Sequence, residues 1–124
     1  MDMNEYQEAA ASTDTGTRIE VVVKLGADGY RDRVRAHYIY LALGLAGETG
    51  EVVEKIKKAV RDDYGRFTDS GIEAIKLELG DVLWYLTRLA SELGLSLDVV
   101  AQANLDKLEA RKARGKLHGE GDNR

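Results

Sequence analysis

The chain of 124 residues contains no cysteine, no proline and only two histidines, His37 and His118. Without cysteine it can form neither disulfides nor thiolate metal sites. The two histidines lie far apart and in no spacing typical of metal ligands, so zinc sites and the Glu-x-x-His motif of di-iron bundles lack their ligands. We interpret His37, which precedes an apolar run, as a helix-surface or partner-contact residue.

The chain also lacks an excess of positive charge and any apolar run of membrane-spanning length. Its formal net charge of −4 gives no electrostatic reason to expect nucleic-acid binding. The N-terminal residues, which include Asp2, Glu5 and Glu8, form no apolar signal region. The length fits one domain with a useful core. We expect a soluble, cytoplasmic domain that contacts neither nucleic acid nor membrane.

The most informative feature that is present is a repeated pair of acidic residues. Glu48 and Glu51 are three positions apart, as are Glu78 and Asp81, and each pair lies in a segment predicted to be helical. Residues three apart on a helix share a face, so each pair directs two carboxylates the same way. Four carboxylates from two helices form a set of hard oxygen ligands, which Mg²⁺ or Mn²⁺ prefers, particularly when a phosphate completes the coordination.

Both acidic pairs lie at the edge of an apolar stripe. The stripes are Leu41, Leu45, Val52, Ile56 and Ala59 in one helix, and Ile72, Ile75, Leu79, Val82, Leu86, Leu89 and Leu93 in the next. A carboxylate at the edge of a core is unfavourable unless something neutralises it. A single acidic pair is most often a solvated charge or a surface ion pair. Two pairs at matched positions on neighbouring helices favour a binding site instead.

The chain is predicted to form one all-α domain, residues 1–124, in three parts. Residues 1–30 hold a short helix from Asn4 to about Ser12 and then an irregular insert, because the β-branched run Ile19–Val23 has no evident partner strand. Residues 31–113 form the helical core. Residues 114–124, rich in glycine and basic residues, have the composition of a disordered tail.

The first helix of the core is predicted to run from about Arg31 to Arg61. It contains Gly44, Gly47 and Gly50, which cost about 1 kcal/mol each relative to alanine in a helix interior. Their presence indicates close approach of another helix or of a ligand, or a break in the helix near Gly44.

Helix caps set the remaining boundaries. After a polar loop, residues 62–69, Ser70 and Glu73 fit a capping box at the start of the next helix. Gly94 fits a left-handed cap at the end of that helix. Ser96 fits the N-cap of the last helix, which runs to about Ala113.

Two segments resemble the halves of the MazG-like nucleotide pyrophosphohydrolase motif. They are Gly44–Glu51, followed by Glu54, Lys57 and Lys58, and Leu77–Leu86. The family pattern, Glu-x-x-Glu, a linker and Glu-x-x-Asp, is met with 26 residues between the two halves. Segments 104–108 and 111–124 also resemble the stand-alone MazG-like branch, so the resemblance covers about residues 38–124.

The resemblance implies a MazG-like bundle of four to five helices that is completed by homo-oligomerisation, as a homodimer or homotetramer. It implies Mg²⁺-dependent hydrolysis (Mn²⁺ being an alternative ion) of a nucleoside triphosphate, a deoxynucleotide or a non-standard one, to monophosphate and pyrophosphate. Its metal ligands would be Glu48, Glu51, Glu78 and Asp81. Some relatives, including dimeric dUTPases, carry a further acidic residue before the first glutamate; here that position is Gly47, and Glu54 is the nearest substitute.

Either Glu48 or Glu51 would be catalytic, orienting or deprotonating the attacking water. The residues predicted to bind substrate are Lys55, Lys58, Trp84, Tyr85, Asn104, Lys107, Arg111 and Arg114. The aromatic pair suits base stacking, although such a pair in an amphipathic helix is more often core or interface. The basic residues of the last helix share one face and suit phosphate contact, with the tail as a lid on the same or a neighbouring subunit. The alternative is a basic end that complements the helix dipole and frays.

Two alternatives to this function are a phosphoribosyl-ATP pyrophosphohydrolase-like enzyme and a non-catalytic acidic helical module that binds a basic partner. The tail and the Trp84–Tyr85 pair favour the MazG-like branch over the first. The matched positions of the two acidic pairs argue against the second. The residues leave open the preferred base and sugar, and whether water attacks the α or the β phosphorus.

Overall fold

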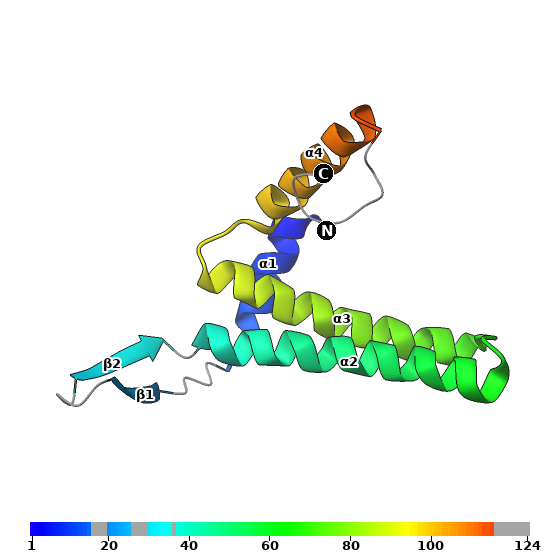
Figure 1. Ribbon diagram of the computed structural model, residues 1–124, viewed down its shortest axis with the longest axis horizontal. Helices are drawn as coiled ribbons and strands as arrows, with labels where there is room; N and C mark the ends of the chain where they lie inside the picture. Colours follow the sequence, from blue (N-terminus) through cyan, green and yellow to red (C-terminus); the bar gives the residue numbers. More distant parts are fainter. Residues whose placement is uncertain (16–19, 26–29, 36, 116–124) are drawn as a thin grey trace.

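The structure, a computed structural model, describes residues 1–15, 20–25, 30–35 and 37–115. Its elements are α1 (Met3–Ser12), β1 (Glu20–Leu25), β2 (Tyr30–Arg35), α2 (His37–Asp63), α3 (Asp69–Glu92) and α4 (Leu97–Ala113). Figure 1 shows α2 and α3 side by side as a long antiparallel pair, from which α4 extends away. The helix α1 contacts both α3 and α4. The helices make up the body of the domain, as predicted, and the strands form a small separate sheet before α2.

The segment between α1 and α2 differs from the prediction of an irregular insert followed by a helix from residue 31. The strands β1 and β2 pair antiparallel, from Glu20 opposite Arg35 to Leu25 opposite Tyr30. This pairing satisfies backbone N–H and C=O groups that an irregular segment would leave to solvent. The partner strand is the segment that we expected to begin the helix. The Gly-Ala-Asp-Gly sequence between the two strands is a turn signal that could have revealed the pairing.

The helix α2 is continuous from His37 to Asp63, so the break considered near Gly44 does not occur. A Cβ atom added at Gly44 would lie only 2.1 Å from the ring of Tyr85 on α3. Glycine at this position therefore allows the two helices to approach closely. Around Gly47 and Gly50, by contrast, no described atom lies within 4 Å of an added Cβ.

Thr68, rather than Ser70, caps the N-terminus of α3. Its Oγ1 accepts a hydrogen bond of 3.1 Å from the Gly71 amide, and its backbone has the extended conformation that an N-cap requires. The predicted capping box is wrong, because Glu73 pairs with Lys76 instead. Both hydroxyls have cap chemistry, and the path of the loop places that of Thr68 over the free amide.

The predicted end of α3 and start of α4 are confirmed. Gly94 adopts a φ of +72° just after α3, and Ser96 precedes α4 in an extended conformation. The Ser96 hydroxyl, however, donates to Asn4 Oδ1 at 3.0 Å and makes no cap bond. The first amide of α4, Leu97 N, donates instead to Gln7 Oε1 at 2.8 Å. The helix α1 thus caps α4 and holds the two together.

The buried core within one chain is small. Among the described residues the buried apolar side chains are Ala10, Leu41, Ala90 and Leu97. The predicted stripe of α3 stays largely uncovered, since Ile72, Leu79 and Leu93 are each more than half exposed. Further large apolar side chains are exposed on α2, α3 and α4, among them Leu43, Val53, Val60, Leu77, Val99 and Leu105. The predicted tail lies outside the described residues beyond Gly115.

Candidate active site

Three of the four predicted metal ligands come together between α2 and α3. One carboxylate oxygen each from Glu48, Glu78 and Asp81 lie within 4.8 Å of one another. Because α2 and α3 run antiparallel, the acidic pair in the middle of one helix meets the pair in the middle of the other. The convergence of carboxylates expected from spacing and helical phase is thus found for these three residues, and their role as metal ligands stays a prediction. We call Glu48, Glu78 and Asp81 the carboxylate cluster.

The crowding of negative charge is concentrated on Glu48. Burial raises the pKa of its carboxyl group, and the negative charges of Asp81, Glu78 and Glu51 raise it further. A raised pKa means that the ionised carboxylate is unfavourable in the folded protein unless a cation is present. One cation is close by, since Lys55 Nζ lies 3.0 Å from Glu78 Oε1.

Glu51, the fourth predicted ligand, lies outside this group of mutually close oxygens. It is exposed and one turn further along α2 than Glu48, although its charge still acts on the Glu48 carboxyl group. Glu54, considered above as a substitute ligand, pairs with Lys57 and Lys58 instead. The structure thus shows a cluster of three carboxylates with Glu51 beside it.

Two tyrosines, Tyr6 and Tyr85, lie close enough to the cluster for its charges to act on them. The pKa of Tyr85 is raised, most strongly by a hydrogen bond with Tyr40 and next by burial. The charges of Tyr40, Glu48 and Asp81 raise it further. Burial and the charge of Asp81 also raise the pKa of Tyr6, on α1. Sequence reasoning had picked out only Tyr85. Tyr40 lies eight residues before Glu48 on α2, a helical spacing that could have revealed it; Tyr6 carries no comparable signal.

A family comparison bears on the site at this point. The profile of the MazG nucleotide pyrophosphohydrolase domain matches residues 37–115. The chain belongs to this family. It is also 47% identical over 85 residues to the Gene 37 protein of Mycobacterium phage L5. The aligned residues cover 68% of this chain and 75% of that protein. No solved structure matches the chain.

The MazG match begins at the first residue of α2 and ends just after α4. It therefore contains the carboxylate cluster and Glu51, and it leaves out α1 and the strands. The family is one of nucleotide pyrophosphohydrolases with an all-α fold, so it implies a nucleotide as substrate. In the part of the chain that the structure describes, no helix is both long enough and apolar enough to span a membrane.

The two predicted base-stacking residues of the MazG domain make contacts between helices. Tyr85 packs against Gly44, and its ring meets that of Trp84 edge-on at 4.9 Å. The indole of Trp84 donates to Thr13 Oγ1 at 2.7 Å, just beyond the end of α1. Within one chain the pair thus holds the helices together, as the alternative interpretation expects.

His37 likewise contacts another element of the chain. Its Nε2 lies 3.4 Å from Asp14 Oδ2, which also accepts from Arg88 at 2.9 Å. The His37 ring stacks beside that of Tyr40, with 6.4 Å between the ring centroids. Asp14 therefore joins the segment after α1 to the start of α2 and to α3, next to the tyrosines of the site.

The predicted substrate ligands on α4 are not brought to the carboxylate cluster within one chain. Figure 1 shows α4 running away from the α2–α3 pair towards the C-terminus. Asn104, Lys107 and Arg114 are exposed there, whereas Arg111 is buried, with 4% of its surface exposed. Their role as substrate ligands stays a prediction.

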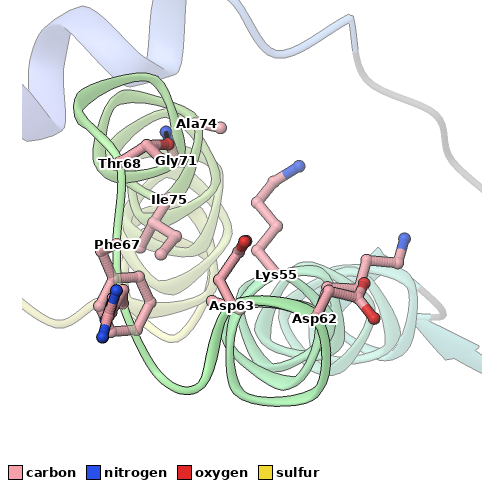
Figure 2. Close-up of a pocket in the computed structure, with 11 residues that line it drawn as sticks. Lys55, Asp62, Asp63, Phe67, Thr68, Gly71, Ala74 and Ile75 are labelled. Carbon is pink, nitrogen blue, oxygen red and sulfur yellow. Dashed lines mark hydrogen bonds between the residues drawn. The ribbon is translucent and has the colours of Figure 1, made fainter.

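Of the two predicted lysine ligands of α2, Lys55 contacts the carboxylate cluster and Lys58 does not. Lys55 and Lys58 line a cavity of about 240 Å³ between α2 and α3, towards the loop that joins them. Figure 2, which views the two helices nearly end-on, shows Lys55 and Asp63 reaching from α2 into the space opposite Phe67 and Ile75. Lys55 thus belongs both to the wall of this cavity and to the edge of the carboxylate cluster.

Proposed function

We propose that this MazG domain catalyses the Mg²⁺-dependent hydrolysis of a nucleoside triphosphate, a deoxynucleotide or a non-standard one, to the monophosphate and pyrophosphate. The observation that carries the proposal is the convergence of Glu48, Glu78 and Asp81 from two helices in a member of a pyrophosphohydrolase family. Removal of unwanted nucleotides from the cellular pool is the role that such an activity would serve.

The donor set of the cluster fits a small hard cation. All three groups are carboxylates, and ligand oxygens around one octahedral Mg²⁺ lie about 3–4 Å apart, so oxygens within 4.8 Å need only small side-chain adjustments. The raised pKa of Glu48 supports the same conclusion, because a bound cation would neutralise the charges that raise it. When bound, the ion supplies charge neutralisation at the phosphoryl oxygens.

Glu51 is the better placed of the two catalytic candidates for handling water. It lies beside the cluster on the same helix, and it is exposed, so it can accept a hydrogen bond from a water molecule. Glu48, which belongs to the cluster, is the better placed ligand. We therefore assign metal binding to Glu48, Glu78 and Asp81, and to Glu51 either a fourth ligand position or the orientation of water.

The role of Glu51 can be tested by the substitution Glu51→Gln. We expect it to lower kcat by about 10²-fold or more and to leave the helical content and the melting temperature nearly unchanged, because the side chain is exposed. The checks are steady-state kinetics and circular dichroism. Near-native turnover in this variant would rule out both proposed roles of Glu51.

Phosphate contacts would come from two subunits. Lys55 reaches Glu78 of the cluster in the same chain and Lys58 lines the adjoining cavity, whereas Asn104, Lys107 and Arg114 would approach the cluster from a second copy. The exposed apolar side chains of α2, α3 and α4 support a homodimer or homotetramer, because so large an apolar surface is unfavourable in a monomer.

The proposed activity can be tested by measuring pyrophosphate release from a panel of triphosphates, with and without Mg²⁺. The panel includes dCTP, dUTP, dTTP, ATP and nucleotides with oxidised or methylated bases, and also phosphoribosyl-ATP. We expect turnover of at least one triphosphate that needs the metal and is lost in Glu48→Gln. Turnover of phosphoribosyl-ATP alone would favour the first alternative, and no turnover of any compound would favour the non-catalytic module.

A further inference from the structure

The contact between Lys55 and Glu78 joins the carboxylate cluster to the cavity beside it. Lys55 Nζ lies 3.0 Å from Glu78 Oε1, across the boundary between α2 and α3. Both side chains are partly buried, with 32% and 21% of their surfaces exposed, so solvent screens this pair less than a fully exposed one. The other two lysines near this part of α2, Lys57 and Lys58, pair with Glu54 instead.

The position of this ammonium group has a consequence for any cation that enters the cluster. The carboxylates of Glu48, Glu78 and Asp81 carry three negative charges within a few ångströms, and Lys55 is held directly against one of them. A cation that uses the same oxygen of Glu78 has to displace the ammonium. Two positive charges at one carboxylate also repel each other.

We propose that Lys55 is a built-in cation that occupies the edge of the carboxylate cluster in the absence of metal, and that metal binding releases its ammonium to the substrate's phosphates. The proposal rests on the proposed function, since it takes the cluster to be the metal site. Lysine suits this exchange because it is a compact charge on a flexible stem with three donors.

The cavity gives the released side chain somewhere to go. Lys55 lines it together with Lys58 and Arg66, and Figure 2 shows the Lys55 stem extending clear of α2 beside it. Because the Lys55 ammonium already reaches Glu78, a rotation of its flexible stem lets it leave that carboxylate and contact an anion bound at the cluster. Lys55 would oppose the binding of metal alone and assist the binding of a metal-bound triphosphate. In this role it competes with free metal at Glu78 and becomes a ligand for the phosphate once the metal is bound.

The decisive measurement is the affinity of Mn²⁺ alone, without nucleotide, by titration calorimetry or electron paramagnetic resonance. Lys55→Met keeps the apolar stem and removes the charge, and we expect it to tighten Mn²⁺ binding about five-fold. Lys58→Met is the matched control, because it removes a charge from the same helix and cavity wall but from a lysine paired with Glu54. It should change the Mn²⁺ affinity by less than about two-fold.

A second variant and a second readout complete the test. Lys55→Gln should tighten Mn²⁺ binding in the same way, and circular dichroism identifies any variant that does not fold. At saturating Mn²⁺ both Lys55 variants should raise KM for the triphosphate about ten-fold with a smaller change in kcat. Unchanged or weaker Mn²⁺ binding in both folded variants would overturn the exchange and make the contact a structural ion pair.

Mn²⁺ binding by the wild-type protein and by Glu48→Gln tests the metal site independently of the role of Lys55. If wild-type binds Mn²⁺ and Glu48→Gln does not, the metal site stands, and the Lys55 variants alone decide the exchange. If neither wild-type nor the folded Lys55 variants bind Mn²⁺, the metal site and the exchange are both overturned.

Discussion

At the scale of single residues, the site is a balance between unfavourable charge and the cation that would relieve it. Glu48 carries most of the imbalance, because burial and its acidic neighbours raise its pKa, while Lys55 offsets the charge on Glu78. The folded protein therefore holds the Glu48 proton to a higher pH than the unfolded chain does. As the pH rises above the ordinary glutamate range, ionisation of Glu48 costs the folded state stability.

This imbalance predicts that Glu48→Gln stabilises the metal-free protein. At pH 7, with EDTA present, we expect its melting temperature to rise by about 2–4 °C. The gain should shrink as the pH falls and vanish well below the ordinary glutamate pKa, where Glu48 is protonated in both states. Glu54→Gln is the matched control: its carboxylate has a lowered pKa because of hydrogen bonds to Lys57 and Lys58, so the variant should gain nothing at pH 7. Equal gains in melting temperature in both variants would show that the unfavourable ionisation is not specific to the carboxylate cluster.

The sequence alone predicted some residues of the site and missed others. Helical spacing predicted Glu48, Glu78 and Asp81 as a group, because i, i+3 geometry and an antiparallel helix pair suffice to bring them together. It could not place Glu51, because the three-residue spacing does not decide which carboxylate of a pair meets the facing helix more closely. Nor could it find Tyr6, which reaches the site through the packing of α1 and not through any periodicity.

At the scale of elements, local signals predicted the helices and failed where a distant segment supplies the contact. Gly94 ended α3 as expected, because a left-handed glycine is a local device. The amide that opens α4 is capped by Gln7, about ninety residues earlier in the chain, and no local pattern shows this. The strands were missed for a related reason, since β1 is stable only with β2, and β2 had been assigned to a helix.

The contact of Gly44 with Tyr85 yields a test of the α2–α3 pair. Gly44→Ala should destabilise the protein by about 1–3 kcal/mol, because the new methyl group would meet the ring at 2.1 Å. Gly47→Ala and Gly50→Ala are matched controls on the same helix with open space around an added Cβ; each should be neutral or stabilise by up to about 1 kcal/mol. Chemical denaturation measures all three. Tyr85→Ala should remove most of the Gly44→Ala penalty, and equal effects at all three glycines would contradict the close approach.

At the scale of the whole molecule, the shape and the exposed apolar surface both point beyond one chain. The α2–α3 pair is long and narrow, and α4 diverges from it instead of covering it (Figure 1). The apolar residues predicted to form a stripe on α3 do lie on that helix, but within one chain many of them are exposed to solvent. A single sequence gives the apolar face of a helix but not the identity of what covers it. We propose that a second copy covers this face and brings its α4 towards the carboxylate cluster.

We therefore expect the protein to be a homodimer or homotetramer in which assembly and activity are linked. Leu79 lies one position from Glu78 and is 51% exposed, so Leu79→Asp would place a charge in the expected subunit contact. Light scattering at micromolar concentration should show an oligomeric mass for wild-type, and a shift of Leu79→Asp towards the monomer with loss of turnover. Lys76→Asp, an exposed change on the same helix that removes no buried apolar area, should keep both mass and turnover. A monomeric wild-type protein with full activity would show instead that one chain completes the site, and would return the phosphate contacts to Lys55 and Lys58.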